Sequence, residues 1–91
     1  MTAPSVVRAV AARTPAKRRL GKIIRERRTA NDMTQGELGE EVARGLGLDE
    51  PIVQQSVARW EAGLAVPSLD TLIVVADVLA FSLDDIRGSA A

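Results

Sequence analysis

Apolar side chains recur every three or four residues along most of this chain, which is the spacing of one face of an α-helix. The pattern predicts five helices, over about residues 14–31, 34–45, 49–63, 67–80 and 82–88. No segment shows the sustained alternation of apolar and polar residues that is typical of a half-buried strand. We therefore expect an all-α fold built from short helices.

Local signals at the helix ends support these bounds. Thr14-Pro15 combines an N-cap residue with a first-turn proline, and Thr34 and Glu37 have the spacing of a capping box. Asp49-Glu50-Pro51 is the start signal of the third helix, and glycines follow both the second and the third helix. We expect a domain over 14–88, preceded over 1–13 by a basic arm that is flexible or a short helix, and followed by a tail over 89–91.

Length and composition narrow the fold to one small core. The chain has 91 residues, 46% of them hydrophobic, and Trp60 and Phe81 are its only aromatic residues. A chain of this size buries roughly two-thirds of its unfolded surface, so the core is small, and here it is aliphatic. The predicted core residues are Leu20, Ile24, Leu38, Val42, Val57, Trp60, Leu72 and Leu79.

The residues that the chain lacks exclude several classes of chemistry. Cysteine and histidine are both absent, which removes disulfides, thiolate metal sites and the commonest general base and metal ligand. We expect no enzyme activity, no metal or other cofactor and no small-molecule ligand. No apolar run reaches the length of a membrane span, so we expect no membrane partner and a cytoplasmic protein.

The charge of the chain is zero in sum but strongly divided along the sequence. Residues 1–31 hold nine basic residues and one acidic residue, a net charge of +8, and residues 32–91 hold three basic and eleven acidic residues, a net charge of −8. A basic segment is typical of proteins that bind a phosphate backbone. Solvated helix faces that pair with the acidic remainder are the alternative interpretation.

Six motifs in a fixed order carry a resemblance to a known family, and together they mark all five helices. They are Ile24-Arg25-Glu26-x-Arg28, Met33-Thr34-Gln35-x-Glu37-Leu38, Gln54-Gln55-Ser56-Val57-Ala58-Arg59-Trp60-Glu61-x-Gly63, Pro67-Ser68-Leu69-x-Thr71-Leu72, Ala76-x-x-Leu79 and Phe81-Ser82-Leu83-Asp84-Asp85-Ile86. From Leu20 to Gly88 the chain resembles the phage Cro and repressor type of helix-turn-helix domain. The resemblance implies the five-helix lambda-repressor-like fold, with the helix-turn-helix in helices two and three.

The resemblance also implies which residues bind double-stranded DNA. The third helix would lie in the major groove, with Gln54, Gln55 and Ser56 at the base-reading positions. A glutamine amide can donate and accept at once, and so can pair with the N6 and N7 atoms of adenine. The alternative is that these residues only fill an exposed helix face.

Further positions are expected to contact phosphates or to position the helices. The residues expected at phosphates are Gln35 at the start of the second helix, Arg59 on the third, and Arg18, Arg19 and Arg25 on the basic first helix. For Arg59 a surface pair with an acidic neighbour is the alternative. Arg28 and Glu61 match a family pair, and we predict a salt bridge between them that fixes the first helix against the third.

The chain departs from the family pattern in three places. Residues 44–51 are about eight extra residues, which either lengthen the turn or extend the recognition helix at its N-terminus from about Asp49. After Gly63, where the family has basic residues, Leu64 and Val66 are expected to form a dimer contact or a lid on the core. Gly39 replaces the usual alanine, and we expect it at a close crossing of helices two and three.

The leading hypothesis is a sequence-specific DNA-binding transcriptional regulator, a small repressor that binds its operator as a homodimer. Two such domains on a two-fold axis would bind half-sites about one helical turn apart. The alternative is a protein-interaction module on the same fold, such as an antitoxin or an adaptor of a transcription complex.

Overall fold

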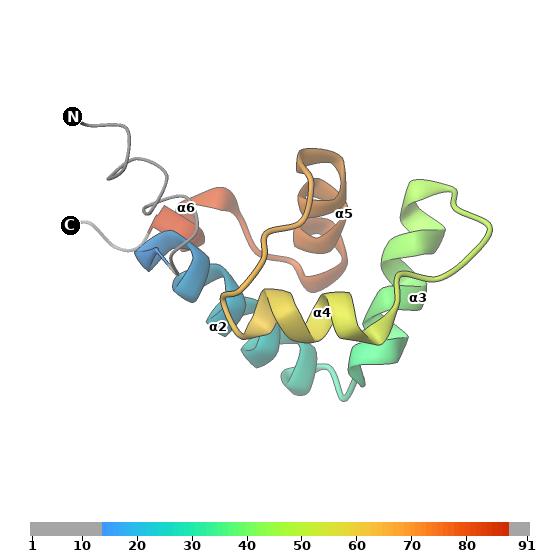
Figure 1. The fold of residues 1–91 in the computed structure, drawn as a ribbon, viewed down its shortest axis with the longest axis horizontal. Helices are drawn as coiled ribbons and strands as arrows, with labels where there is room; N and C mark the ends of the chain where they lie inside the picture. Colours follow the sequence, from blue (N-terminus) through green and yellow to red (C-terminus); the bar gives the residue numbers. More distant parts are fainter. Residues whose placement is uncertain (1–13, 88–91) are drawn as a thin grey trace.

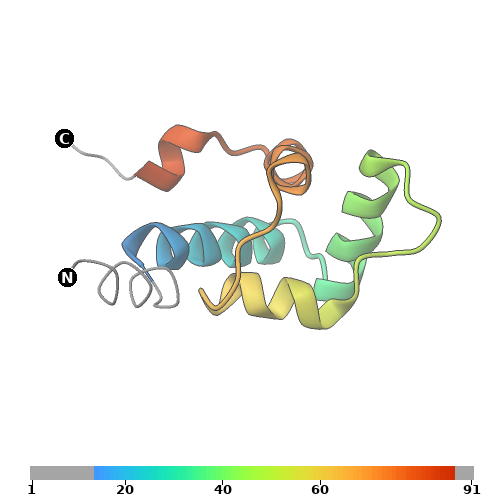
Figure 2. The same ribbon diagram turned by 45° about the horizontal axis from the view of Figure 1, so that its top comes forward.

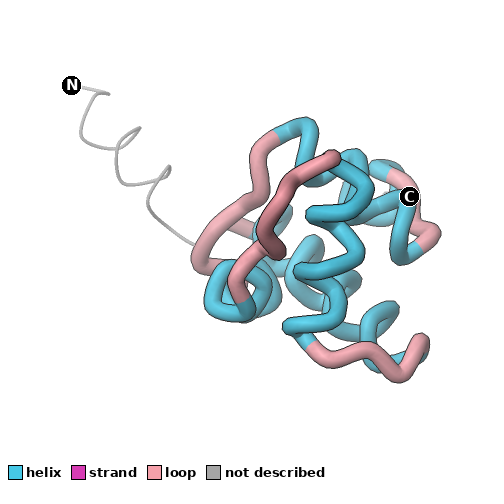
Figure 3. Tube along the Cα trace, turned by 90° about the vertical axis from the view of Figure 1, so that its right-hand side faces the viewer, coloured by secondary structure: helices cyan, strands magenta, loops and turns pink. Residues whose placement is uncertain are grey.

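The computed structural model describes residues 14–87, and the expected arm over 1–13 and tail over 89–91 lie outside them. Five helices make up the described part: α2 (Pro15–Ala30), α3 (Gln35–Leu46), α4 (Gln54–Glu61), α5 (Leu69–Leu79) and α6 (Leu83–Arg87). Between residues 14 and 87 only helices and loops occur, with no strand (Figure 3). The expected all-α, five-helix architecture is confirmed.

The longest helix, α2, runs from beside α6 at the left of Figure 1 down to the lower centre of the molecule. In the turned view of Figure 2, α4 lies along one side of α2, and α5 and α6 lie on the other side. Helix α3 packs against both α4 and α5 at one end of the molecule. This arrangement leaves the side of α4 that faces away from α2 uncovered by any other described helix.

The core is formed where these helices meet. Its buried apolar residues are Leu20, Ile24, Leu38, Val42, Ala43, Val57, Trp60, Val75, Leu79 and Phe81. Seven of the eight predicted core residues are among them. Leu72 is only partly buried, because it lines a shallow apolar hollow of about 290 Å³ together with Val66 and Ile86.

Two of the predicted helix starts have the expected hydrogen bonds. The Thr14 hydroxyl accepts from the Lys17 N–H, and Thr34 and Glu37 form a complete capping box. The predicted start at Asp49 is wrong, since α4 begins at Gln54 with Val53 as an N-cap whose side chain makes no cap hydrogen bond. A capping residue near a proline was a misleading local signal here.

Two glycines bring backbones into direct contact. A Cβ added to Gly21 would lie 2.5 Å from the carbonyl oxygens of Trp60 and Glu61, so α2 touches the end of α4 backbone to backbone. A Cβ on Gly39 would lie 2.1 Å from the Ile52 oxygen, and the Ile52 N–H donates to the Gly39 carbonyl. The close approach at Gly39 is therefore to the turn before α4, and not to the third helix itself as predicted.

None of the helices within residues 14–87 is long and apolar enough to cross a membrane. The same residues contain no group of three or more acidic side chains placed to hold a metal ion.

Candidate nucleic-acid interface

The extra residues 44–51 lie at the end of α3 and in the turn that leads to α4. Helix α3 continues to Leu46 and ends at Gly47, which adopts a left-handed conformation with φ of 73°. The chain then runs through an irregular turn until α4 begins at Gln54. The insertion therefore extends α3 by its last residues and lengthens the turn, and the recognition helix is not extended. Asp49 and Glu50 lie exposed in that turn.

Helix α4 presents a polar face to solvent. Val57 and Trp60 are buried beneath it, whereas Gln54, Gln55 and Arg59 are exposed. Ser56 is half-buried. The predicted base-reading residues thus share the first turn of an eight-residue helix whose opposite face is anchored in the core.

A three-residue network fixes α4 against its neighbours. The Arg28 guanidinium donates to both Glu61 carboxylate oxygens, from Nε at 2.5 Å and from Nη2 at 3.1 Å, and its Nη1 donates to the Met33 carbonyl. The Gln35 amide donates to Glu61 Oε1 at 3.0 Å. The predicted ion pair of Arg28 and Glu61 is confirmed. The hydrogen bond from Gln35 extends the network to the start of α3.

The network is largely shielded from water. The Arg28 and Glu61 side chains are only 13% and 3% exposed. The hydrogen bond from Arg28 to Glu61 raises the pKa of Arg28, desolvation opposes this rise, and the charge of Glu61 adds to it. The raised pKa means that the network favours the charged form of Arg28.

The hydrogen bond to Glu61 limits which donor groups of Gln35 can bind a phosphate. Its side-chain nitrogen already donates to Glu61. The first N–H groups of a helix have no intrahelical acceptor, and in α3 those of Glu37 and Leu38 are used by Thr34. The backbone N–H groups of Gln35 and Gly36 are therefore the donors that this helix start can direct at a phosphate oxygen.

Three cations of α2 form a basic row beside α4. Arg18, Lys22 and Arg25 line a hollow of about 390 Å³ together with Glu26 of the same helix and with Glu61 and Ala62 at the end of α4. Their spacing places them on one side of α2 over two turns. Arg18 and Arg25 were predicted as phosphate contacts, and Lys22 was not, although the same helical spacing could have placed it beside them.

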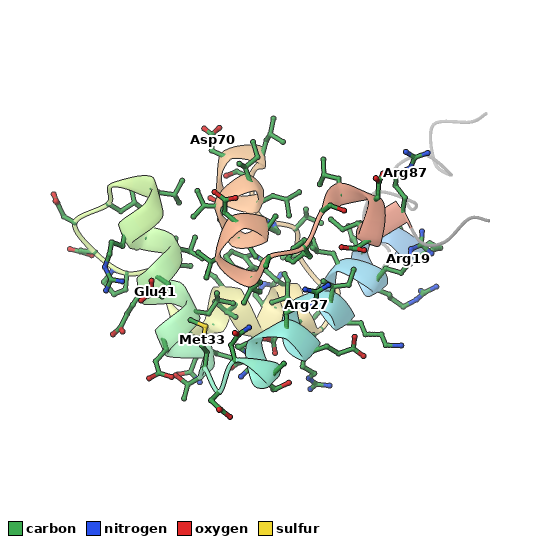
Figure 4. The ribbon with its side chains drawn as sticks, turned by 180° about the vertical axis from the view of Figure 1, so that it is seen from behind. Arg19, Arg27, Met33, Glu41, Asp70 and Arg87 are labelled. Atoms are coloured by element: carbon green, nitrogen blue, oxygen red, sulfur yellow. The ribbon has the colours of Figure 1, made fainter. Side chains whose placement is uncertain are left out.

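Arg19 lies on a different side of α2. Its Nε donates to the Ile86 carbonyl at 2.7 Å, and Nη1 of Arg27 donates to the Ala80 carbonyl at 2.9 Å. Figure 4 shows Arg19 at the end of α2 that lies next to α6. Both arginines fasten the C-terminal part of the domain to α2. The phosphate contact predicted for Arg19 is therefore withdrawn.

Apolar side chains are exposed on the side of α5 and in the loop before it. In the loop, Leu64 is 52% and Val66 is 47% exposed. On α5, Leu69 and Ile73 are 68% and 54% exposed. Val66 also borders the hollow at Leu72, so it covers part of the core while leaving apolar surface free.

One family model matches the chain, over residues 24–86, and its description is "Helix-turn-helix". No curated protein and no solved structure matches the chain. The matched range contains the Arg28–Glu61 pair, the α3–turn–α4 unit and the exposed glutamines of α4. The chain belongs to the Cro/C1-type helix-turn-helix family of DNA-binding regulatory domains.

Proposed function

We propose that this protein is a sequence-specific repressor that reads the major groove with α4 and acts by occupying its operator. The observation that carries the proposal is the exposed polar face of α4, held in place by the largely shielded Arg28–Glu61 pair. A rigid helix with outward glutamines suits base recognition, because direct readout needs side chains of fixed position. Occupation of an operator needs no further surface, since a bound domain blocks other proteins from the same DNA.

Base recognition falls to Gln54, Gln55 and Ser56. Each glutamine can pair with adenine through N6 and N7, and the Ser56 hydroxyl can donate to or accept from a base edge or a phosphate. Backbone contacts fall to Gln35 and to Arg18 and Arg25 on either side of α4. Lys22 joins them, because it lines the same hollow.

We also propose that two copies bind together on DNA. The exposed Leu64 and Val66 follow α4 closely in the chain and offer apolar surface to a second copy. A two-fold pair of α4 helices would place two half-sites about one turn of DNA apart. We also propose that the protein acts in the compartment that holds the DNA it binds, in line with the cytoplasmic location expected from the sequence.

Selection of bound fragments from a random DNA library tests the proposal. The wild-type protein should enrich one motif with two related half-sites. The double variant Gln54→Ala/Gln55→Ala should lose preference at the adenine positions, whereas Arg87→Ala, an exposed arginine on α6, should enrich the same motif as the wild type. Enrichment of no motif, or an unchanged motif in the double variant, would overturn the proposal.

The protein-interaction module is kept as a second candidate on one observation. The outward side of α5 combines exposed Leu69 and Ile73 with the exposed carboxylates of Asp70 and Asp77. Such a surface repels DNA and suits a basic, apolar protein segment. Absence of DNA binding at low salt, together with saturable binding of a protein partner to this face, would favour the module.

A further inference from the structure

An apolar hollow of about 290 Å³ opens beside the start of α2, where this helix lies next to α6 (Figure 1). Its apolar walls are Leu20 of α2, Val66 of the loop before α5, Leu72 of α5 and Ile86 of α6. Thr14, the residue before α2, also lines it. The hollow thus lies at the point where the described part of the chain begins.

The side chains around this hollow are left partly uncovered by the described residues. Val66 is 47% exposed, and Leu72 and Ile86 are half-buried although both pack against the core cluster. Water that enters an apolar hollow finds few hydrogen-bonding partners, so covering these walls with further apolar side chains is favourable. The hollow is therefore a gap in the apolar cover of the core, and a segment with aliphatic side chains would close it.

The residues that precede Thr14 have the composition and the reach to close this gap. Residues 6–12 are three valines (Val6, Val7 and Val10), three alanines and a single arginine. Thr14 is an N-cap with extended backbone, at φ −74° and ψ 164°, which ends α2 at this point. An extended chain spans at most about 3.6 Å per residue, which keeps Val10 within about 14 Å of Thr14. The three valines can therefore reach the walls of the hollow.

We propose that the three valines dock in this hollow as one aliphatic cluster, against Leu72 and Ile86 of the same chain. Their spacing of i, i+1 and i+4 places them on one side of a helical turn. Arg8 would lie on the opposite side of that turn, where its guanidinium stays in water. Residues 88–91, which follow α6, are one glycine, one serine and two alanines, so their side chains are too small to fill the hollow.

Docking would give this segment a structural role in place of the role of a basic arm. It would join the start of α2 to α5 and α6, which supply the walls of the hollow. None of the described residues that line the hollow belongs to α4, so the inference does not depend on DNA binding by that helix. Leu64 does not line the hollow either, so its apolar surface stays available to a second copy.

Thermal unfolding of the whole protein without DNA tests the docking. The triple variant Val6→Ser/Val7→Ser/Val10→Ser should lower Tm by about 5 °C, the shift expected when a domain of this size loses the burial of about one aliphatic side chain. The three positions lie outside the buried core of the described residues, so the variant should keep its fold. An unchanged Tm would overturn the proposal.

A second change, in the wall of the hollow, shows whether the valines lie there. Val66→Ser should lower Tm clearly less in the triple variant than in the wild type, because effects of residues in contact are not additive. Leu48→Ser is the matched control, since Leu48 is a loop residue that is 50% exposed and does not line the hollow. Its effect should be the same in both backgrounds. Equal effects of Val66→Ser in the two backgrounds would show that the valines do not contact this wall.

Nuclear Overhauser effects between methyl groups identify the occupant of the hollow. In the methyl-labelled protein, the three valines should give cross-peaks to the methyl groups of Leu72 and Ile86. In a mixture of labelled and unlabelled protein, these cross-peaks should not arise between copies. Cross-peaks between copies would assign the hollow to the same segment of a second copy, and the absence of both kinds would leave the hollow without these valines. Either result would overturn the proposal.

Discussion

At the scale of single residues, the carboxylate of Glu61 has the largest structural role. The carboxylate accepts hydrogen bonds from Arg28 on α2 and from Gln35 on α3, and Glu61 is the last residue of α4. Three helices thus share one charge that is almost entirely shielded from water. Removing one partner of a shielded pair leaves the other charge without compensation, which costs more than the pair contributes in sum.

Glu61→Gln is therefore expected to lower the free energy of unfolding by about 3 kcal/mol. Urea denaturation followed by Trp60 fluorescence measures this change. The control is Glu41→Gln, whose pair with Arg44 has side chains that are 45% and 70% exposed. Breaking such a surface pair should cost at most about 0.5 kcal/mol. Equal effects of the two variants would show that the Glu61 network does not hold the helices together.

At the scale of helices, the position of α4 depends on close backbone contact at Gly21. The carbonyl groups of Trp60 and Glu61 lie where a side chain at position 21 would be. Backbone atoms cannot turn aside as a flexible side chain does, so a larger residue would move α4 as a whole. The outward direction of the glutamines would change with it.

Gly21→Ala should destabilise the protein by about 2 kcal/mol, the typical cost of overpacking, and should weaken DNA binding as well. Gly36→Ala is the matched control in α3, because the nearest atom to its added Cβ is 3.9 Å away. Alanine favours helix over glycine, so this control should gain up to about 1 kcal/mol. Urea denaturation of both variants tests the contrast, and destabilisation of equal size at the two positions would argue against it.

Some of the helix starts and contacts between helices could be predicted from the sequence, and others could not. The capping box of Thr34 and Glu37 was predictable from its fixed spacing, and the pair of Arg28 and Glu61 was predictable from the resemblance to the family. The start of α4 was not predictable from the local sequence. Asp49 and Pro51 have good local start chemistry, but the Ile52 backbone packs on Gly39 and delays the helix until Gln54. Tertiary contact outweighed the local signal.

The roles of the arginines on α2 show a second limit. Arg18 and Arg19 are neighbours of the same residue type, and nothing in the composition separates them. Arg18 lines the hollow beside α4, whereas Arg19 donates to the Ile86 carbonyl, because α6 packs on the other side of α2. A contact between residues 67 positions apart in the chain has no local signature.

At the scale of the whole molecule, the divided charge has a structural meaning. The basic row of Arg18, Lys22 and Arg25 lines the hollow at the end of α4, whereas Asp70, Asp77 and Asp84 lie exposed on α5 and α6. In Figure 2, α5 and α6 lie on the side of α2 opposite to α4. The domain therefore presents its basic row beside α4 and these acidic residues on the far side, which favours the orientation on DNA that we propose.

The charge arrangement predicts a specific salt dependence. Arg25→Ala and Lys22→Ala should each reduce the slope of log affinity against log salt by about one, as expected when one phosphate contact is lost. Arg19→Ala should leave the slope unchanged, because Arg19 binds the Ile86 carbonyl. Fluorescence anisotropy with a labelled duplex at several salt concentrations measures the slopes. A reduced slope for Arg19→Ala alone would mean that the DNA lies on the α6 side.

We propose that the exposed face of α4, flanked by the start of α3 and the basic row of α2, is the surface that meets DNA. Titration of the ¹⁵N-labelled protein with a bound duplex, followed by backbone amide chemical shifts, tests this surface directly. We expect the largest changes at Gln35, at Gln54, Gln55 and Arg59, and along the side of α2 that carries Lys22. The largest changes at Leu69 and Ile73 of α5, with α4 unaffected, would contradict it.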